Sequence, residues 1–439
     1  MVDPPVGAPD EQVREAQDDL PSARQLPRLL VPFAIPAYRR MAVALSCGAF
    51  AYGVWTVALV WEVIRIGGGP AQLSVVSTAG AIGVMLPALI AGVVADRVPQ
   101  KLVVMTVASA EAVSYTVVAA LSLAALTQLW HLAVVAFAIG AGMSFYYSAY
   151  SAWLPAIVPS SDLLAVNGFE GMVRPLVSQA LGPAVAGAVV GALSPGSAVA
   201  VAAVVAATGV VVQVRLPRTP VRRDLATAER SVAGVLVDLR EGVAYMVRTP
   251  WLLATLLFAS LMVLMTMGPI EVLMPFLIKD GLGGDPGDHA LVLTAFGVGG
   301  ALGSLGVASM KMPRRYLTWM NLTWGVACLP MVVMGRATEV WVVVVCGFVL
   351  GVLFSAPMVI WGTLLQRRVP PELLGRVASL DFFVSISLMP VSMALAAPVA
   401  DLIGLRNTFL IAGVAPVVFA VLAIFWARLP QDEIANPLD

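Results

Sequence analysis

The stretch GVVADRVPQK at residues 92–101 ends a long apolar segment with an aspartate–arginine pair, and a lysine follows four residues after the arginine. These charges stand out because only 12% of the 439 residues are charged, whereas 59% are hydrophobic. Globular domains contain roughly 45–50% apolar residues, and the mean hydropathy here is +0.91. The composition therefore indicates a membrane protein, with this stretch as a short polar connection between two spans.

Apolar segments of about 20 residues, the length that a helix needs to cross a bilayer, recur twelve times on either side of this stretch. The sequence predicts an all-α membrane protein with twelve transmembrane helices in two six-helix halves. The expected spans are 41–63, 71–95, 102–125, 130–154, 168–193, 196–214, 251–278, 290–310, 316–335, 339–365, 377–402 and 406–428. The expected domains are a disordered cytoplasmic tail (1–36), an N-terminal half (37–214), a cytoplasmic linker (215–250), a C-terminal half (251–428) and a second tail (429–439).

The opening stretch has a partner in the second half of the chain. GVVADRVPQK at 92–101 aligns without gaps on GVASMKMPRR at 306–315, and VPSSDLLA at 158–165 resembles VPPELLG at 369–375. Two matches at nearly the same offset indicate a duplicated six-helix unit. Repeats that flank a site at the centre of the membrane are a common plan of transporters.

The stretch at 92–101 resembles a motif of a known family. It resembles the signature loop of the major facilitator superfamily between helices 2 and 3, G-x-x-x-D-R-x-G-R-(R/K). Pro99 and Gln100 replace the usual glycine and first basic residue, and the matching positions are Gly92, Asp96, Arg97 and Lys101. In this family the loop faces helix 11, so the resemblance implies a conformational latch that also includes Arg376 and Asp381. A plain topogenic loop is the alternative, but it leaves Asp96 unexplained.

A second motif narrows the resemblance to one branch. LGPAVAG at 181–187 resembles the motif of drug:proton antiporters, carried by Gly182, Pro183 and Gly187. With VPPELLGRVASL at 369–380, the chain after the tail is similar to the branch that holds macrolide efflux proteins, the enterobactin exporter and actinobacterial multidrug pumps. This resemblance implies a bacterial cytoplasmic membrane transporter that acts as a monomer.

Charged residues inside spans are costly and therefore indicate function. Glu271 follows Gly268-Pro269, a break that widens access for water, and is weighed as a coupling carboxylate against a structural hydrogen-bonding partner. Glu111 lies near the middle of its span, but a structural role is favoured because third helices of this fold usually pack on the outside. Glu170 and Arg174 stand four residues apart on one helical face and can neutralise each other. The candidates for proton coupling are Glu271, Glu111, Glu170 and Arg174.

Aromatic residues and methionines in three spans are candidates for a substrate cavity. In the family that this chain resembles, spans 1, 4, 7 and 10 line the cavity, and such side chains form pliable apolar pockets. Plain packing is the competing interpretation. The candidates are Tyr52, Trp55, Tyr146, Tyr150, Trp153, Met262 and Met265.

Other functional classes find little support. His131 and His289 fall at the edge of an apolar segment and in a polar loop, so neither a metal site nor a cofactor is expected. The run GVGGALGSLG at 297–306 lacks dinucleotide-binding spacing, and Gly299 and Gly303 instead indicate close helix packing. Balanced charge, with 26 basic and 26 acidic residues, argues against a nucleic-acid partner.

The sequence thus predicts a secondary transporter, not an enzyme, that exports amphipathic or lipophilic small molecules by proton antiport with alternating access. Its expected partners are the small-molecule substrate, protons and the lipid bilayer. An uptake or siderophore-type metabolite carrier on the same fold is the main alternative. A membrane-embedded transferase is a weaker one, because the chain lacks a histidine or cysteine cluster.

The distribution of basic residues predicts the orientation. Of the 26 basic residues, 21 lie in the tails and the even-numbered connections, and cytoplasmic loops carry such an excess. Both termini and residues 215–250 should therefore be cytoplasmic. A cysteine at Ala226 should resist an impermeant thiol reagent in intact cells, and labelling as strong as that of a cysteine at Asp285 would contradict this topology.

Overall fold

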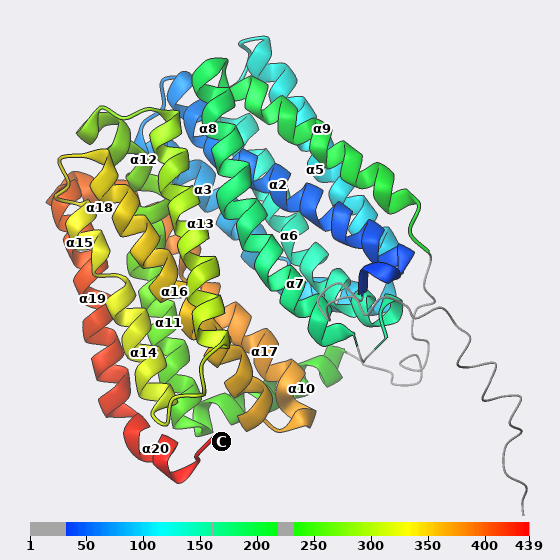
Figure 1. Cartoon of the computed structure of the whole chain (residues 1–439), viewed down its shortest axis with the longest axis vertical. Coiled ribbons are helices and arrows are strands. Elements are labelled where there is room, and N and C mark those ends of the chain that lie inside the picture. Colours follow the sequence, from blue (N-terminus) through cyan, green and yellow to red (C-terminus); the bar gives the residue numbers. More distant parts are fainter. Residues whose placement is uncertain (1–31, 160–161, 218–231, 439) are drawn as a thin grey trace, which may run out of the picture.

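The computed structural model describes residues 32–159, 162–217 and 232–438. In this part of the chain every regular element is a helix (Figure 1), which confirms the predicted fold class. Residues 1–31 of the predicted N-terminal tail and 218–231 of the predicted linker lie outside the described residues.

The first six predicted spans correspond to helices that follow one another through short connections. They are α2 (Pro36–Arg65), α3 (Pro70–Met85) with α4 (Ala88–Arg97), α5 (Gln100–Leu123), α6 (Leu129–Ile157), α7 (Leu163–Pro175) with the π-helical η2 (Leu176–Leu181) and α8 (Gly182–Ala192), and α9 (Pro195–Val214). Three of these helices, α2, α3 and α9, begin at a proline, whose missing N–H and fixed φ suit the first helical turn.

The last six spans follow the helix α10 (Val232–Arg248). They are α11 (Pro250–Gly268) with η4 (Pro269–Leu273), α12 (Met274–Phe276) and η5 (Leu277–Gly281); α13 (Pro286–Ala308); α14 (Tyr316–Ala327) with α15 (Pro330–Met334); α16 (Val340–Arg368); α17 (Pro371–Ile386) with α18 (Met389–Ile403); and α19 (Leu405–Trp426). A short helix, α20 (Leu429–Ala435), follows the last span.

Eleven helical segments of the described chain are long and apolar enough to cross a membrane. The predicted second span, 71–95, differs from the structure because its helix is divided at Pro87 into the 16-residue α3 and the 10-residue α4. Proline has no N–H for the helical ladder and its ring clashes with the preceding turn. Together α3 and α4 still cover the length of the predicted span.

Glycines allow two pairs of helices to approach closely. A Cβ on Gly299 or Gly303 of α13 would collide with backbone carbonyls of α16, which confirms the predicted close packing. In the same way, a Cβ on Gly83 of α3 or on Gly140 of α6 would collide with the backbone of the other helix. The second and fourth spans of the first half therefore pack like the corresponding spans of the second half.

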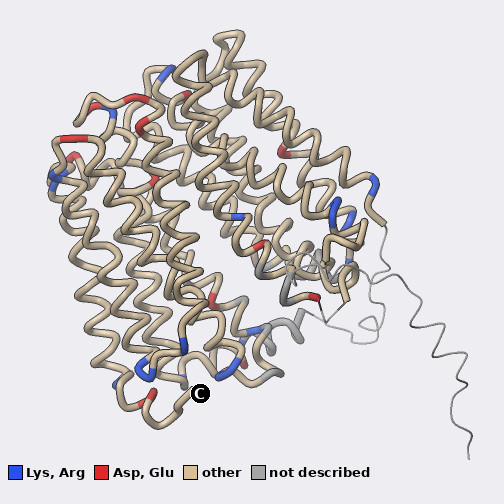
Figure 2. Tube along the Cα trace, in the orientation of Figure 1, with Lys and Arg blue, Asp and Glu red and all other residues tan. Residues whose placement is uncertain are grey.

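The two sets of six spans lie side by side (Figure 1) and contact each other mainly through α3 with α18 and α8 with α13. We call the end of the bundle that carries α10 and α20 the linker end, and the other the opposite end. The paired segments α3, α18, α8 and the first turns of α13 lie toward the opposite end. Figure 2 shows that charged residues concentrate at the two ends, with a few inside the bundle.

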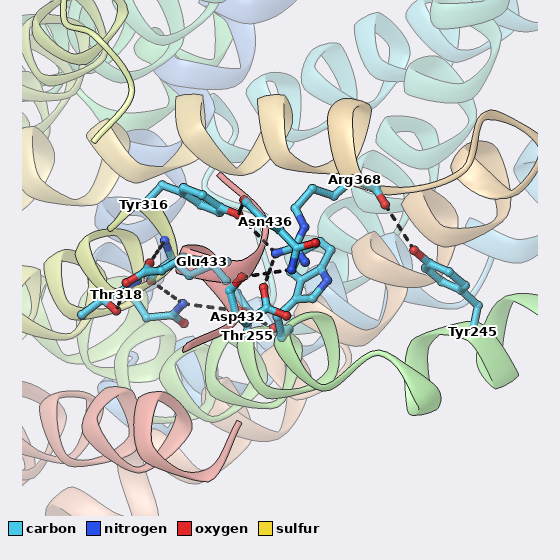
Figure 3. Close-up of polar contacts among 11 residues, drawn as sticks. Tyr245, Thr255, Tyr316, Thr318, Arg368, Asp432, Glu433 and Asn436 are labelled. Atoms are coloured by element: carbon cyan, nitrogen blue, oxygen red, sulfur yellow. Dashed lines mark hydrogen bonds and ion pairs between the residues drawn. The ribbon is translucent and has the colours of Figure 1, made fainter. Parts of the chain in front are cut away.

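The helix α20 folds back against the linker end and joins several spans (Figure 3). The buried Glu433 carboxylate accepts hydrogen bonds from the backbone N–H groups of Leu317 (2.9 Å) and Thr318 (3.1 Å), at the start of α14. Asp432 forms an ion pair of 2.5 Å with Arg368, whose guanidinium lies 4.6 Å from the centre of the Trp251 ring. A negative charge at a helix N-terminus and a stacked arginine are both stabilising.

We predict that Glu433→Ala destabilises the protein. The substitution leaves two N–H groups at a buried helix start without an acceptor, which costs about 1–3 kcal/mol each. The apparent melting temperature in detergent should fall by several degrees, whereas Gln431→Ala, at an exposed position of the same helix, should leave it unchanged. Equal melting temperatures for the two variants would show that α20 does not stabilise the bundle.

Candidate functional site

A cavity of about 530 Å³ lies between the two sets of spans. Its size falls within the roughly 300–1,000 Å³ of pockets that bind drug-sized molecules. The wall is mainly apolar and aromatic, and it includes Tyr147 of α6, Phe296 of α13 and Phe354 of α16. Three charged residues interrupt this surface, namely Glu111, Arg174 and Glu271.

Glu271 reaches the cavity because the seventh span departs from a regular α-helix. It belongs to the π-helical segment η4, which starts at Pro269, directly after Gly268. The hydroxyl of Ser392 on α18 accepts a hydrogen bond of 2.8 Å from Gly268 N and donates one of 2.7 Å to Leu264 O. It thus bridges a donor and an acceptor that a regular α-helix pairs with each other. The Glu271 side chain is exposed to the cavity although it lies deep in the protein.

Glu111 on α5 also lines the cavity, contrary to the expectation that the third span is remote from it. One Glu111 oxygen lies 3.5 Å from the position of a Cβ on Gly142 of α6, so the absence of a side chain there leaves room for it. The phenol of Tyr52 on α2 is close enough to interact electrostatically with both Glu111 and Glu271. In the described part of the chain neither carboxylate forms an ion pair.

Glu170 and Arg174 form the predicted pair, with 3.1 Å between Arg174 Nη2 and Glu170 Oε2. Tyr150 completes the group, because its hydroxyl donates to the other Glu170 oxygen and its ring centre lies 4.9 Å from the guanidinium carbon. Of the pair, Arg174 is on the cavity wall, and Glu170 is only 5% exposed. The charge of Arg174 is therefore already balanced, unlike those of the two cavity carboxylates.

The predicted aromatic and methionine positions divide between the cavity and the core. Tyr52 and Tyr146 line the cavity. Trp55 packs against Tyr115, with ring centres 5.6 Å apart. The remaining candidates do not lie on the wall, because their helical faces pack against neighbouring helices or stand away from the cavity: Tyr150, Trp153, Met262 and Met265.

In the predicted latch, three residues have partners among the described residues. Lys101 Nζ donates to the carbonyls of Val214 (2.8 Å) and Leu216 (2.6 Å), at the end of α9. Arg376 forms an ion pair of 2.5 Å with Glu241 of α10. Asp381 accepts hydrogen bonds from Trp361 Nε1 (3.0 Å) and Ser385 Oγ (3.3 Å).

The remaining latch positions lie on α4. Gly92 and Arg97 are exposed, and the side chain of Asp96 is not among the described ones. The latch therefore remains a prediction from the sequence.

The antiporter-type motif lies where the two sets of spans meet. Gly182 packs against Gly53 of α2, and Pro183 lines the cavity. A Cβ on Gly187 would collide with Ala290 and lie 3.0 Å from the carbonyl of Pro286, both on α13. Glycine at this position therefore permits α8 and α13 to approach closely at the opposite end.

His289 is a cavity residue that the sequence pattern placed in a polar loop. It instead belongs to the first turn of α13, is 3% exposed and lines the cavity. The preceding Asp285-Pro286 was a usable signal, because an aspartate N-cap followed by proline marks a helix start. Asp285 indeed caps the helix by accepting from Asp288 N at 3.0 Å.

Comparisons with known proteins agree with this geometry. The transmembrane secretion effector family model matches residues 28–438. The multidrug efflux pump Tap of Mycolicibacterium fortuitum is 28% identical over 93% of this chain and 98% of its own length. Macrolide efflux protein A of Streptococcus pyogenes is 24% identical over 83% and 90%.

Among solved structures, a mutant of the nucleoside transporter NupG superposes with a TM-score of 0.67. That alignment covers 89% of this chain and 99% of NupG at 12% identity, and so supports the fold alone. The match of the family model over nearly the whole chain shows that this protein belongs to the transmembrane secretion effector family of the major facilitator superfamily, and is thus a multi-pass membrane transporter and not an enzyme.

Proposed function

We propose that this protein exports amphipathic or lipophilic small molecules in exchange for protons, by alternating access of the central cavity. The observation that carries the proposal is the pair of carboxylates, Glu111 and Glu271, that face an otherwise apolar and aromatic cavity without forming an ion pair in the described part of the chain. The efflux functions in the names of Tap and macrolide efflux protein A support the direction of transport.

The apolar wall and the carboxylates have different tasks in this proposal. Burial of apolar substrate surface against Phe296, Phe354 and Tyr147 supplies affinity with little demand on substrate shape. A carboxylic acid in a site of low dielectric favours its neutral form unless a cation or water stabilises the charge. A bound proton and a bound amphipathic molecule therefore compete for the same carboxylates, which is the basis of antiport.

Glu271 is the better of the two candidates for the coupling proton. It lies beside the Gly268-Pro269 break, where Ser392 of α18 bridges two backbone groups of α11. A change in the relative position of α11 and α18 would alter both this bridge and the surroundings of Glu271. Glu111, by contrast, is on the regular helix α5.

The geometry also suggests the direction of opening. The two sets of spans meet near the opposite end through α3 with α18 and α8 with α13, so this conformation is closed there. With the linker end in the cytoplasm of a bacterial cell, as the basic residues predict, the cavity would load substrate from the cytoplasm or the inner leaflet. Opening at the opposite end would release the substrate outside and admit a proton.

We predict that Glu271→Gln abolishes proton-driven export but preserves exchange. The amide mimics the protonated acid permanently, so substrate can still bind and move down its own gradient. In proteoliposomes with an imposed pH gradient, ethidium accumulation should fall to the level of protein-free vesicles, while ethidium exchange without a gradient should persist. Glu339→Gln, at an exposed site before α16, is the control and should behave like the wild type.

Two other outcomes would argue against Glu271 as the residue that binds the coupling proton. A Glu271→Gln protein that still concentrates ethidium against its gradient would show that the coupling proton binds elsewhere, with Glu111 and Glu170 the next candidates. A uniform fall in both transport modes, together with less folded protein, would assign Glu271 a structural role.

We predict that Asp96→Asn abolishes transport without loss of folded protein. The substitution keeps the size of the side chain and removes its charge, so a latch that closes the linker end should fail. Efflux from cells that express the variant at the wild-type level should be lost. If efflux is unchanged, the stretch at 92–101 has only a topogenic role.

A further inference from the structure

His289 is a buried polar residue that the proposed coupling through Glu271 does not use. Its side chain is 3% exposed and lies on the cavity wall, in the first turn of α13. Its Nδ1 atom is fully buried and has no hydrogen-bond partner in the described part of the chain. Buried imidazoles usually have both ring nitrogens in defined hydrogen bonds, so this arrangement calls for an explanation.

Among the described residues, none with a charge forms an ion pair with His289 or a hydrogen bond with its Nδ1 atom. On its own helix, Asp285 and Asp288 accept from each other's backbone N–H groups at 3.0 Å. The charged or titratable residues that line the same cavity from other elements are Tyr52 of α2, Glu111 of α5, Tyr146 and Tyr147 of α6, Arg174 of α7, Glu271 of η4 and Cys328 after α14. Three further elements pack against α13, namely α8, η2 and α16. The residues with which they line the cavity are uncharged.

His289 also lies next to the helix contact that closes the opposite end. Its neighbour Ala290, with Pro286 and Gly287 of the same turn, forms the contact with Gly187 of α8. Separation of α8 from α13 would remove this contact and bring water to the first turn of α13. The environment of the imidazole therefore differs between the closed and the opened opposite end.

We propose that His289 is a proton-binding residue whose protonation favours the state in which the cavity opens at the opposite end. In the closed state, a second ring N–H would place a charged donor in a buried position without an acceptor, which is unfavourable. In the opened state, water solvates the imidazolium. A proton that arrives from the opposite side thus stabilises the conformation that is open to that side.

This inference rests on the proposed function only in one respect, namely that proton binding at His289 serves proton-driven export. Glu271 would couple proton and substrate through competition in the cavity, whereas His289 controls the conformational equilibrium. A ligand that binds one of two states more tightly shifts the population by that difference in affinity. At His289 the proton is such a ligand, because it binds more tightly in the state that is open at the opposite end.

The test measures the opening of the opposite end as a function of pH. Spin labels at Leu193, after α8, and Leu402, in α18, occupy positions 74% and 83% exposed, in a protein whose three cysteines are replaced by alanine. Their distance distribution is recorded by electron double resonance in nanodiscs between about pH 8 and pH 5, the range in which an imidazole normally changes charge.

In the unsubstituted background the longer-distance population should increase as the pH falls. His289→Gln cannot take up the proton and should lose most of this increase. The control is His131→Gln, which removes the other of the two histidines. His131 lies outside the cavity and accepts a hydrogen bond of 3.0 Å from Gln128 N. This variant should retain the pH-dependent increase. A full pH-dependent opening in His289→Gln, or none in the background protein, overturns the proposal.

A second measurement does not depend on the folding of the His289 variant. Because the chain has two histidines, ring ¹³C labelling of the His131→Gln protein leaves one signal, which belongs to His289. That signal should titrate over the same pH range as the spin-label distances change. A signal that does not respond to pH contradicts the proposal, whereas absence of proton-driven ethidium transport would contradict only the proposed function.

Discussion

The hydroxyl of Ser392 on α18 bridges two backbone groups of α11, and the carboxylate at the centre of the site lies directly after this bridge. Inside a bilayer each unsatisfied backbone group costs several kcal/mol, so a break in a spanning helix persists only where another group satisfies it. Ser392 accepts from Gly268 N and donates to Leu264 O. This bridge lies directly before the π-helical segment η4, whose Glu271 lines the cavity.

The same constraint separates the structural charges from those available for transport. Glu62 is fully buried but accepts two hydrogen bonds from Arg65, at 2.8 and 2.7 Å, and one of 2.8 Å from Ser122. Glu170 and Arg174 balance each other in a similar way. Removing one partner from such a group would leave an uncompensated buried charge. Glu111 and Glu271 lack comparable partners in the described chain, which distinguishes them from the other acids.

Hydropathy and local spacing in the sequence were enough to predict most of the helical framework. Span positions, the pairing of Glu170 with Arg174 and the close packing at Gly299 depend on periodicities that persist in the folded chain. The division at Pro87 was missed because the apolar run continues across it without a change in composition. Hydropathy detects the length of a span but does not detect a break within it.

The cavity was harder to predict, because its wall depends on how the helices are rotated relative to one another. Tyr150 and Trp153 share a helical face with Tyr146, yet only Tyr146 reaches the cavity. The helix α6 is long, and its C-terminal part is covered by neighbours, among them Tyr38. His289 was assigned to a loop on the basis of its polar neighbours, although the aspartate and proline before it mark a helix start. Such assignments depend on contacts between segments that are distant in the sequence.

The central claim, that substrate and protons move in opposite directions through this cavity, can be tested by recording both fluxes in the same vesicles. Wild-type protein is reconstituted into proteoliposomes that are acidic inside and carry a pH-sensitive dye, and ethidium is added outside. We expect that ethidium entry accelerates the loss of internal protons, and that both fluxes cease when the pH gradient is dissipated. Ethidium accumulation with no change in the rate of proton loss would contradict it.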